Sequence, residues 1–334
     1  MRIRFVITLL CLCCFVWATS DCGAQTSKDT LSRTLTAKTK SGKKKSKEQT
    51  PAETRNYTSF RDASSAGYEL KNEGKLEASR DAYEASLKFE STERQKCEVY
   101  RSLVSIYPEL DQWDAMFEAT EHIVENAPYP AFSSLTVRAL NSIVYRKKQQ
   151  DLLFARYEAK LEKNPKDRTS LVVLESAVQQ LKYDMPRRAE YLQRLIDLDI
   201  EEKKPADPEM RVQLAFALRL SHKAAESAKL YEAIAKSDKD YRAFCLAEAA
   251  ESWQRADQPK KAIAAANKAS KLGPGVRASR SLYQWHRLLG DLFLKHLEKA
   301  SAKKHYTAAL ENATIDPYRD QCREQLKLVN ALKD

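Results

Sequence analysis

The sequence predicts an all-α fold, an α-solenoid of stacked antiparallel helix pairs. Three observations support this prediction. The 334 residues include only 7 glycines, whereas a many-stranded sandwich or barrel needs more of them for its tight turns. Strong helix formers such as alanine, leucine, lysine and glutamate dominate the composition. Small and large residues also recur in units of similar length, which is typical of a helical repeat.

Residues 1–24 are predicted to be a secretory signal peptide. Arg2 and Arg4 precede a short apolar run over residues 5–18, and small residues follow, in the order of a signal's three regions. The run is shorter than the roughly 20 residues that span a bilayer. Cleavage fits after Ala18 or after Ala24, and an uncleaved anchor is the alternative. We therefore expect an exported protein, periplasmic or secreted, that is not an integral membrane protein once the signal is removed.

Residues 25–56 are predicted to be a disordered, lysine-rich tail. They hold nine Lys and Arg residues against three acidic ones and almost no large apolar residue, so burial cannot offset the entropy cost of ordering the segment. The segment is either a solvated spacer or a contact to an anionic surface through Lys43, Lys44, Lys45 and Lys47. Because more than half of the formal net charge of +11 lies in this tail, the nearly balanced remainder is not predicted to bind a specific nucleic acid.

Residues 57–334 are predicted to form the helix pairs. Counting from Ala243, Ala250, Ala262 and Ala269 fall at positions 8, 20 and 27 of a 34-residue unit, and Trp253 falls at position 11. Small side chains at those three positions let two antiparallel helices approach closely. The large side chain at position 11 fills the space between neighbouring units.

Two further units repeat this pattern. In units counted from Tyr283 and from Phe60, glycine takes position 8 and tyrosine takes position 24, as Gly290 with Tyr306 and Gly67 with Tyr83.

Weaker matches fill the rest of the chain. One begins at Cys97 and another lies near Pro208, while residues 168–198 keep a helical period with little of the pattern. Unit spacing varies, so the connecting loops must vary in length. Residues 317–334 contain an amphipathic segment, predicted to be a helix that caps the last apolar face of the array. A partner-binding helix is the alternative.

These units resemble the tetratricopeptide-repeat family over residues 57–316, and the resemblance implies that the helix pairs coil into a right-handed superhelix. The resemblance implies binding of a protein or peptide on the concave surface, which first-helix positions near 2, 5, 9 and 12 line in that family. On this basis we expect the following residues to contact a partner: Ala247, Glu251, Gln254, Gln284, Arg287, Asp291 and Leu294. One subset of the family grips a partner's terminal carboxylate with Lys at position 5 and Asn at position 9. Ala247 and Glu251 occupy those positions here, which disfavours that mode of binding.

No pattern in the sequence indicates catalysis. It contains no GxxxxGK[ST] phosphate loop, no HExxH metal motif, no GxSxG nucleophile motif and no GxGxxG fingerprint. The three cysteines beyond the predicted signal, Cys97, Cys245 and Cys322, lie in no metal-binding spacing. We interpret them as packing residues, with one disulfide as the alternative. No cofactor and no bound metal are predicted.

The predicted function is therefore a non-enzymatic scaffold or adaptor for protein–protein interaction outside the cytoplasm. Two alternatives stay open. The first is an envelope-tethered recruiting factor that docks through its basic tail, and the second is a helical-solenoid enzyme.

Overall fold

A computed structural model describes residues 56–205, 207–275 and 281–332. Within these ranges the chain forms fifteen α-helices, one short 3₁₀ helix and one π-helical turn, and it contains no strand. The all-α prediction is thereby confirmed. The predicted signal peptide and all of the predicted tail except Asn56 lie outside the described residues, and so do the four tail lysines.

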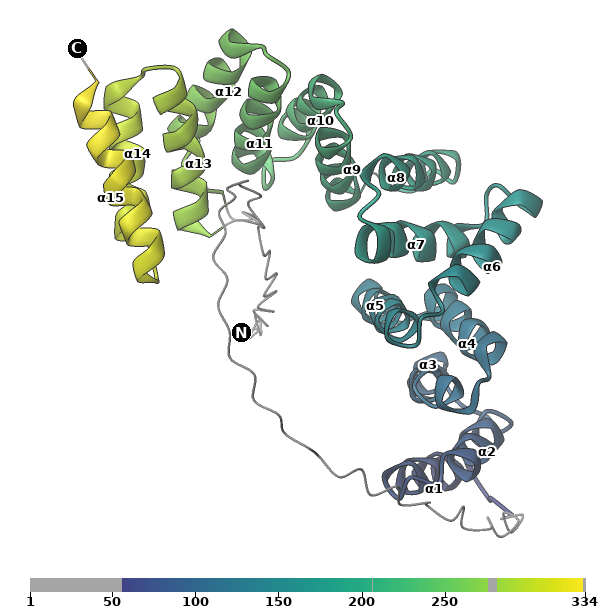
Figure 1. Ribbon diagram of the computed structural model, residues 1–334. Helices are drawn as coiled ribbons and strands as arrows, with labels where there is room; N and C mark the ends of the chain where they lie inside the picture. Colours follow the sequence, from purple (N-terminus) through teal and green to yellow (C-terminus); the bar gives the residue numbers. More distant parts are fainter. Residues whose placement is uncertain (1–55, 206, 276–280, 333–334) are drawn as a thin grey trace, which may run out of the picture. The chain divides into compact units, whose positions relative to one another are not determined.

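The helices pack in the order of the sequence (Figure 1). Each helix contacts the next, and successive helices form antiparallel pairs, each with a first and a second helix. The pairs are α1 (Phe60–Asn72) with α2 (Leu76–Ser86), α3 (Glu93–Val104) with α4 (Trp113–Asn126), α5 (Pro130–Arg146) with α6 (Gln150–Lys163), α7 (Arg168–Ala177) with α8 (Met185–Glu201), α9 (Pro208–Leu220) with α10 (Ala224–Ser237), α11 (Arg242–Arg255) with α12 (Pro259–Leu272), and α13 (Leu282–Lys295) with α14 (Lys299–Glu311).

Local capping signals fix several helix starts. The Ser59 side chain accepts a hydrogen bond from the backbone N–H of the third residue of α1. Thr92 with Gln95 and Ser281 with Gln284 form reciprocal capping boxes at the starts of α3 and α13. Each box satisfies backbone N–H groups that the first helical turn leaves without a partner.

The turn between the two helices of a pair has the same backbone feature in all seven pairs. One residue in each turn adopts the left-handed conformation, with φ between 52° and 77°: Gly74, Asp111, Lys148, Tyr183, His222, Asp257 and Leu297. This conformation reverses the chain directly after a helix. The weakly matching segments of the sequence are therefore helix pairs of the same kind.

Two of the weakly matching pairs contain an irregular turn between their two helices. A 3₁₀ helix, Tyr107–Leu110, follows α3, and a π-helical turn, Val178–Lys182, extends α7. Both lie just before the left-handed residue of their pair. Both change the spacing of apolar positions, because a 3₁₀ turn holds fewer residues than an α-helical turn and a π-helical turn holds more.

The core consists of five clusters of buried apolar side chains packed between the helices of the described ranges. Its C-terminal part is rich in alanine, with Ala250, Ala262, Ala266 and Ala269 fully buried between α11 and α12. Alanine side chains allow these two helices to approach closely, as the sequence pattern predicted.

The three cysteines of the described chain serve this packing. Cys97, Cys245 and Cys322 are all buried and none forms a disulfide. Burial raises the pKa of Cys245 to about 12, so its thiol stays protonated and unreactive. The packing interpretation of these residues is confirmed.

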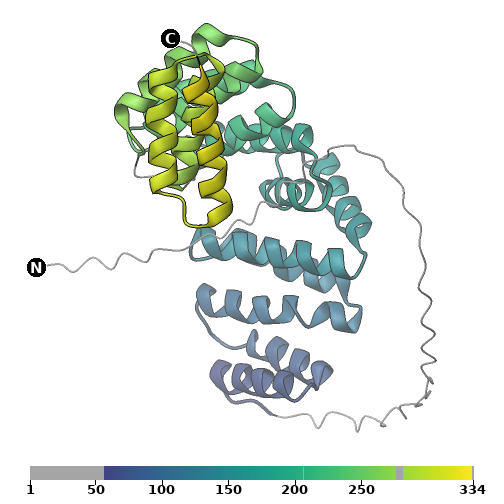
Figure 2. The same cartoon turned by 60° about the vertical axis from the view of Figure 1, so that its left-hand side comes forward.

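The last helix, α15 (Asp316–Ala331), packs along α14, and Figure 2 shows the two side by side in yellow-green and yellow. It buries Cys322 and Val329 against the array. Lys299 of α14 donates a hydrogen bond to the backbone carbonyl of Leu332, 2.8 Å away. The predicted capping helix is confirmed. No helix in the described ranges is both long and apolar enough to cross a bilayer.

Candidate functional site

Hydrogen bonds between polar side chains join three of the first helices to the first helix of the next pair. Lys71 Nζ, in α1, donates to Ser105 Oγ, 2.7 Å away and directly after α3. Asn141 of α5 donates to the Ser176 hydroxyl of α7 at 3.1 Å. Arg219 of α9 donates to Glu251 of α11 at 3.0 Å. We name the surface formed by the odd-numbered helices α1 to α13 the first-helix face.

On α11, the predicted partner-binding residues are largely occupied by internal contacts. Ala247 is only 1 % exposed and packs in the core. Its side chain therefore offers almost no free surface, and its contact with a partner stays a prediction. Glu251 accepts hydrogen bonds from Arg219 and from Arg255, at 3.0 and 2.9 Å. Gln254 is half-buried.

On α13, the remaining predicted residues are also engaged. Gln284 closes the capping box at the start of the helix. Arg287 donates to the side chain of Gln321 in α15 at 3.0 Å. Asp291 accepts from the Tyr306 hydroxyl at 2.6 Å, and Leu294 packs against the core. Contact between these four residues and a partner stays a prediction.

Charged side chains of α9 and α11 form a buried ionic cluster that stabilises the fold. Arg219, with 3 % of its side chain exposed, lies 2.8 Å from Glu248 and 3.0 Å from Glu251. Burial alone would lower the pKa of Arg219, but the two carboxylates more than offset it and raise the pKa. The cluster therefore fastens α9 to α11 with charges that are shielded from a partner.

The most exposed large apolar side chains of the first-helix face lie on its N-terminal helices, while Leu282 of α13 is 48 % exposed. Tyr68 of α1 is 62 % exposed, and Leu135 and Tyr145 of α5 are 58 % and 63 % exposed. Arg101 of α3 and Arg138 of α5 are exposed as well. We name these five residues of α1, α3 and α5 the N-terminal patch.

Two contacts join the three helices that carry the patch. Lys71 lies one turn after Tyr68, and its partner Ser105 lies one turn after Arg101. The Arg101 guanidinium lies 5.0 Å from the ring centre of Phe132 in α5. Because residues three and four apart lie close together on a helix, these contacts place α1, α3 and α5 next to one another, with Tyr68, Arg101 and Leu135 close to the contacts.

Within α5, the three patch residues follow helical spacing. Leu135, Arg138 and Tyr145 recur at intervals of three and seven residues, so they form one stripe. Neither Arg101 nor Arg138 forms an ion pair with any described residue. The patch thus combines large apolar surface with two guanidinium groups that are available to a carboxylate.

A second polar cluster, buried between the last two helix pairs, has a structural role. His305 Nε2 of α14 lies 2.8 Å from Ser270 Oγ of α12, and its Nδ1 lies 3.0 Å from Nδ1 of His286 in α13. Burial, helped by His286 and Lys304, lowers the pKa of His305 to about 4. Burial likewise lowers the pKa of His286. Both rings are therefore neutral near pH 7 and link three helices.

The described ranges contain no group of three or more His, Cys, Asp or Glu side chains that could hold a metal ion.

The packing inside a helix pair decides the fold family. A Cβ atom placed on Gly67 would come within 2.8 Å of the Tyr83 ring, and one placed on Gly290 would come within 2.9 Å of the Tyr306 ring. Both contacts join positions 8 and 24 of a unit. The fold is a tetratricopeptide-repeat-like α-solenoid. The small residues at positions 20 and 27 of the last two units agree with it, since they are fully buried: Ala262, Ala269, Ala302 and Ala309.

Comparison with known proteins gives likeness at the level of fold. No protein-family model matches the sequence, and no curated protein matches it. A tetratricopeptide repeat protein from Parabacteroides merdae is 14 % identical with a TM-score of 0.37, over 81 % of this chain and 98 % of that one. The C-terminal part of a TPR repeat-containing protein from Cytophaga hutchinsonii is 15 % identical with a TM-score of 0.46, over 80 % and 99 %. Pseudomonas aeruginosa pilF is 12 % identical with a TM-score of 0.32, over 80 % and 97 %. Likeness this distant carries no argument about function.

Tetratricopeptide numbering shows which signal could have revealed the patch. Tyr68 directly follows Gly67 and takes position 9 of its unit, one of the positions expected to line the binding surface. For α5, Tyr157 sits at position 24, and counting back from it gives Leu135 position 2 and Tyr145 position 12. Partner-binding residues are predicted from these positions only in the last two units, where the match to the repeat pattern is strongest.

Proposed function

We propose that this protein is a non-catalytic scaffold that acts outside the cytoplasm and binds a partner protein on the N-terminal patch of the first-helix face. The patch carries the proposal. Tyr68, Leu135 and Tyr145 are each more than half exposed, and Arg101 and Arg138 lie beside them. Tyrosine and arginine supply much of the binding energy at protein interfaces, because each buries a large area and still offers a polar group.

The chemistry of the patch defines the partner. Two guanidinium groups on one surface favour carboxylates that can accept paired hydrogen bonds. The tyrosine and leucine side chains favour apolar groups next to those carboxylates. The expected partner therefore presents an apolar surface bordered by aspartate or glutamate.

Affinity capture with matched variants tests this function. Tyr68→Ser, Leu135→Ser and Tyr145→Ser together remove the apolar surface of the patch. The control combines Tyr183→Asn, Ile200→Ser and Leu328→Ser, three residues of similar size and exposure elsewhere on the protein (59 %, 67 % and 55 %). A partner that binds the patch is retained by the wild type and the control and lost from the patch variant. If all three proteins retain the same partners, the patch is not the docking surface.

Export is part of the proposal and is supported by the composition of residues 1–24. N-terminal sequencing of the protein recovered outside the cytoplasm should begin at residue 19 or at residue 25. Recovery of the chain with an intact Met1 would contradict cleavage.

The composition of residues 25–56 supports a second role, tethering to an anionic surface. Sedimentation with vesicles that contain anionic lipid should fall when this segment is deleted, and it should fall with rising salt. Equal sedimentation of the full and the shortened protein would exclude the tether.

A further inference from the structure

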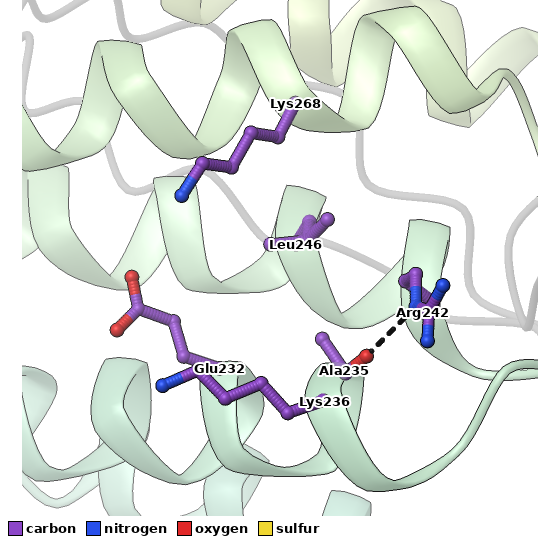
Figure 3. A pocket seen from close by; sticks show the side chains of 6 residues that line it. All are labelled: Glu232, Ala235, Lys236, Arg242, Leu246 and Lys268. Carbon is purple, nitrogen blue, oxygen red and sulfur yellow. Dashed lines mark hydrogen bonds between the residues drawn. The ribbon is translucent and has the colours of Figure 1, made fainter.

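A cleft of about 420 Å³ opens between α10, α11 and α12. Figure 3 shows Glu232 rising from α10 and Lys268 descending from α12 into the same gap, with Leu246 of α11 between them. Lys236 and Arg242 complete the rim of this cleft. The volume falls within the range of sites that take a few residues of a ligand.

Two of the side chains that line the cleft are held in place. The Arg242 Nε–H donates to the backbone carbonyl of Ala235 at 3.0 Å, which fixes the guanidinium at one end. Glu232 accepts a hydrogen bond from the Trp253 indole N–H at 3.0 Å. The cleft therefore has a preset arrangement of one cation and one carboxylate.

The other two charged groups are available to a ligand. Lys236 and Lys268 are exposed, and neither forms an ion pair or hydrogen bond with a described residue. Three cations thus face one carboxylate in the cleft. The surroundings strengthen the positive field, because α12 carries three lysines besides Lys268 and no acidic residue.

We infer that this cleft is a second docking site, which binds an extended acidic segment of a partner protein with an apolar side chain between its carboxylates. Leu246 and Ala235 give the cleft its apolar surface, and the lysines of α10 and α12 flank it. An apolar side chain can therefore rest on Leu246 while neighbouring carboxylates reach Lys236 and Lys268.

Glu232 favours a peptide over a uniformly charged polymer. A sulfated or phosphorylated chain carries a negative charge on nearly every unit, so one of its charges would lie beside the fixed Glu232 carboxylate. A peptide avoids this repulsion by placing its uncharged residue there.

This site is independent of the proposed function. Glu232, Lys236 and Lys268 belong to second helices near the C-terminus, whereas the N-terminal patch belongs to α1, α3 and α5. A variant at one site leaves the other intact, so the two proposals can fail separately.

Fluorescence anisotropy with a defined probe tests the inference. The probe is a short fluorescein-labelled peptide with one leucine between two pairs of glutamates. Lys236→Glu combined with Lys268→Glu should weaken its binding at least about tenfold, since both rim charges are reversed. The matched control is Lys303→Glu with Lys304→Glu, two exposed lysines of α14 outside the cleft. The control should bind within about twofold of the wild type, because its altered charges lie outside the cleft.

The outcomes are distinct. Both double variants carry the same net charge and keep residues 25–56, so tail binding and the general field contribute equally to both. No saturable binding to the wild type, or equal weakening in both variants, overturns the inference. Tighter binding of a sulfated oligosaccharide than of the peptide, lost in the cleft variant, would make the cleft a polyanion site instead. The patch variant should bind the peptide like the wild type.

Discussion

At the scale of single residues, the contacts that a repeat pattern demands are found where the sequence placed them. Glycine meets tyrosine inside the first pair and the seventh pair, and in both places a methyl group would collide with the ring. The repeat pattern could not predict which polar residues would form contacts within the protein. Arg219 and Glu251 contact each other from different pairs, thirty-two positions apart, and nothing in the spacing of either residue signals that contact.

Gly290→Ala should destabilise the protein by about 1–3 kcal/mol, because the added Cβ would lie 2.9 Å from the Tyr306 ring. Urea unfolding measures the loss. In a Tyr306→Leu background, where the ring is absent, the same change should cost much less. An equal cost in both backgrounds would show that the ring is not the cause.

The stability of the protein should decrease as the pH is lowered, because the folded chain keeps His305 neutral. Burial lowers its pKa from 6.5 to about 4, so between these two values the unfolded chain binds a proton that the folded chain does not. Stability is therefore lost as pH falls through this window, by up to about 3 kcal/mol.

Thermal unfolding of a His305→Gln variant checks this dependence. Its melting temperature should change less between about pH 7 and pH 4.5 than that of the wild type. His222→Asn, at an exposed turn, is the control and should keep the wild-type slope. Equal slopes in all three proteins would contradict the role of His305.

At the scale of helices, the presence of each helix was easier to predict than its position in the 34-residue repeat. The alanine-rich last pairs follow the 34-residue pattern. The pair of α7 and α8 departs from it, and the π-helical turn Val178–Lys182 between these helices shifts the apolar positions of α8 relative to those of α7. The left-handed residue in each turn was also not predictable from the sequence. Only Gly74 marks it with the residue that this conformation favours, and the other six pairs use residues such as Lys148 and Tyr183.

Leu297→Gly should stabilise the protein by about 1 kcal/mol. Leu297 adopts φ 60° and is 71 % exposed, so glycine relieves the left-handed backbone cost and little packing is lost. Leu272→Gly, near the end of α12 and 53 % exposed, should instead destabilise by about 0.5–1 kcal/mol, because glycine weakens a helix. Urea unfolding compares the two. Destabilisation by both would mean that the turn is not strained.

At the scale of the whole molecule, the first-helix face has residues engaged in internal contacts in its C-terminal half and exposed residues in its N-terminal half. The match to the repeat pattern did not predict this difference. The best-matching units attracted the binding-site prediction, yet their α11 and α13 residues hold the array together. The units near the N-terminus carry the exposed Tyr68, Leu135 and Tyr145 instead. A good match to a repeat pattern reports tight packing between helices, and surface residues that bind a partner are outside that pattern.

Site-specific photocrosslinking in the native compartment tests the central claim most directly. A photoreactive phenylalanine analogue replaces Tyr68, Tyr145 or Tyr183, three exposed tyrosines of similar exposure (62 %, 63 % and 59 %). If the N-terminal patch binds a partner, positions 68 and 145 crosslink to the same protein and position 183 does not. Crosslinking to that protein from position 183 with equal yield, or none from positions 68 and 145, would contradict the claim.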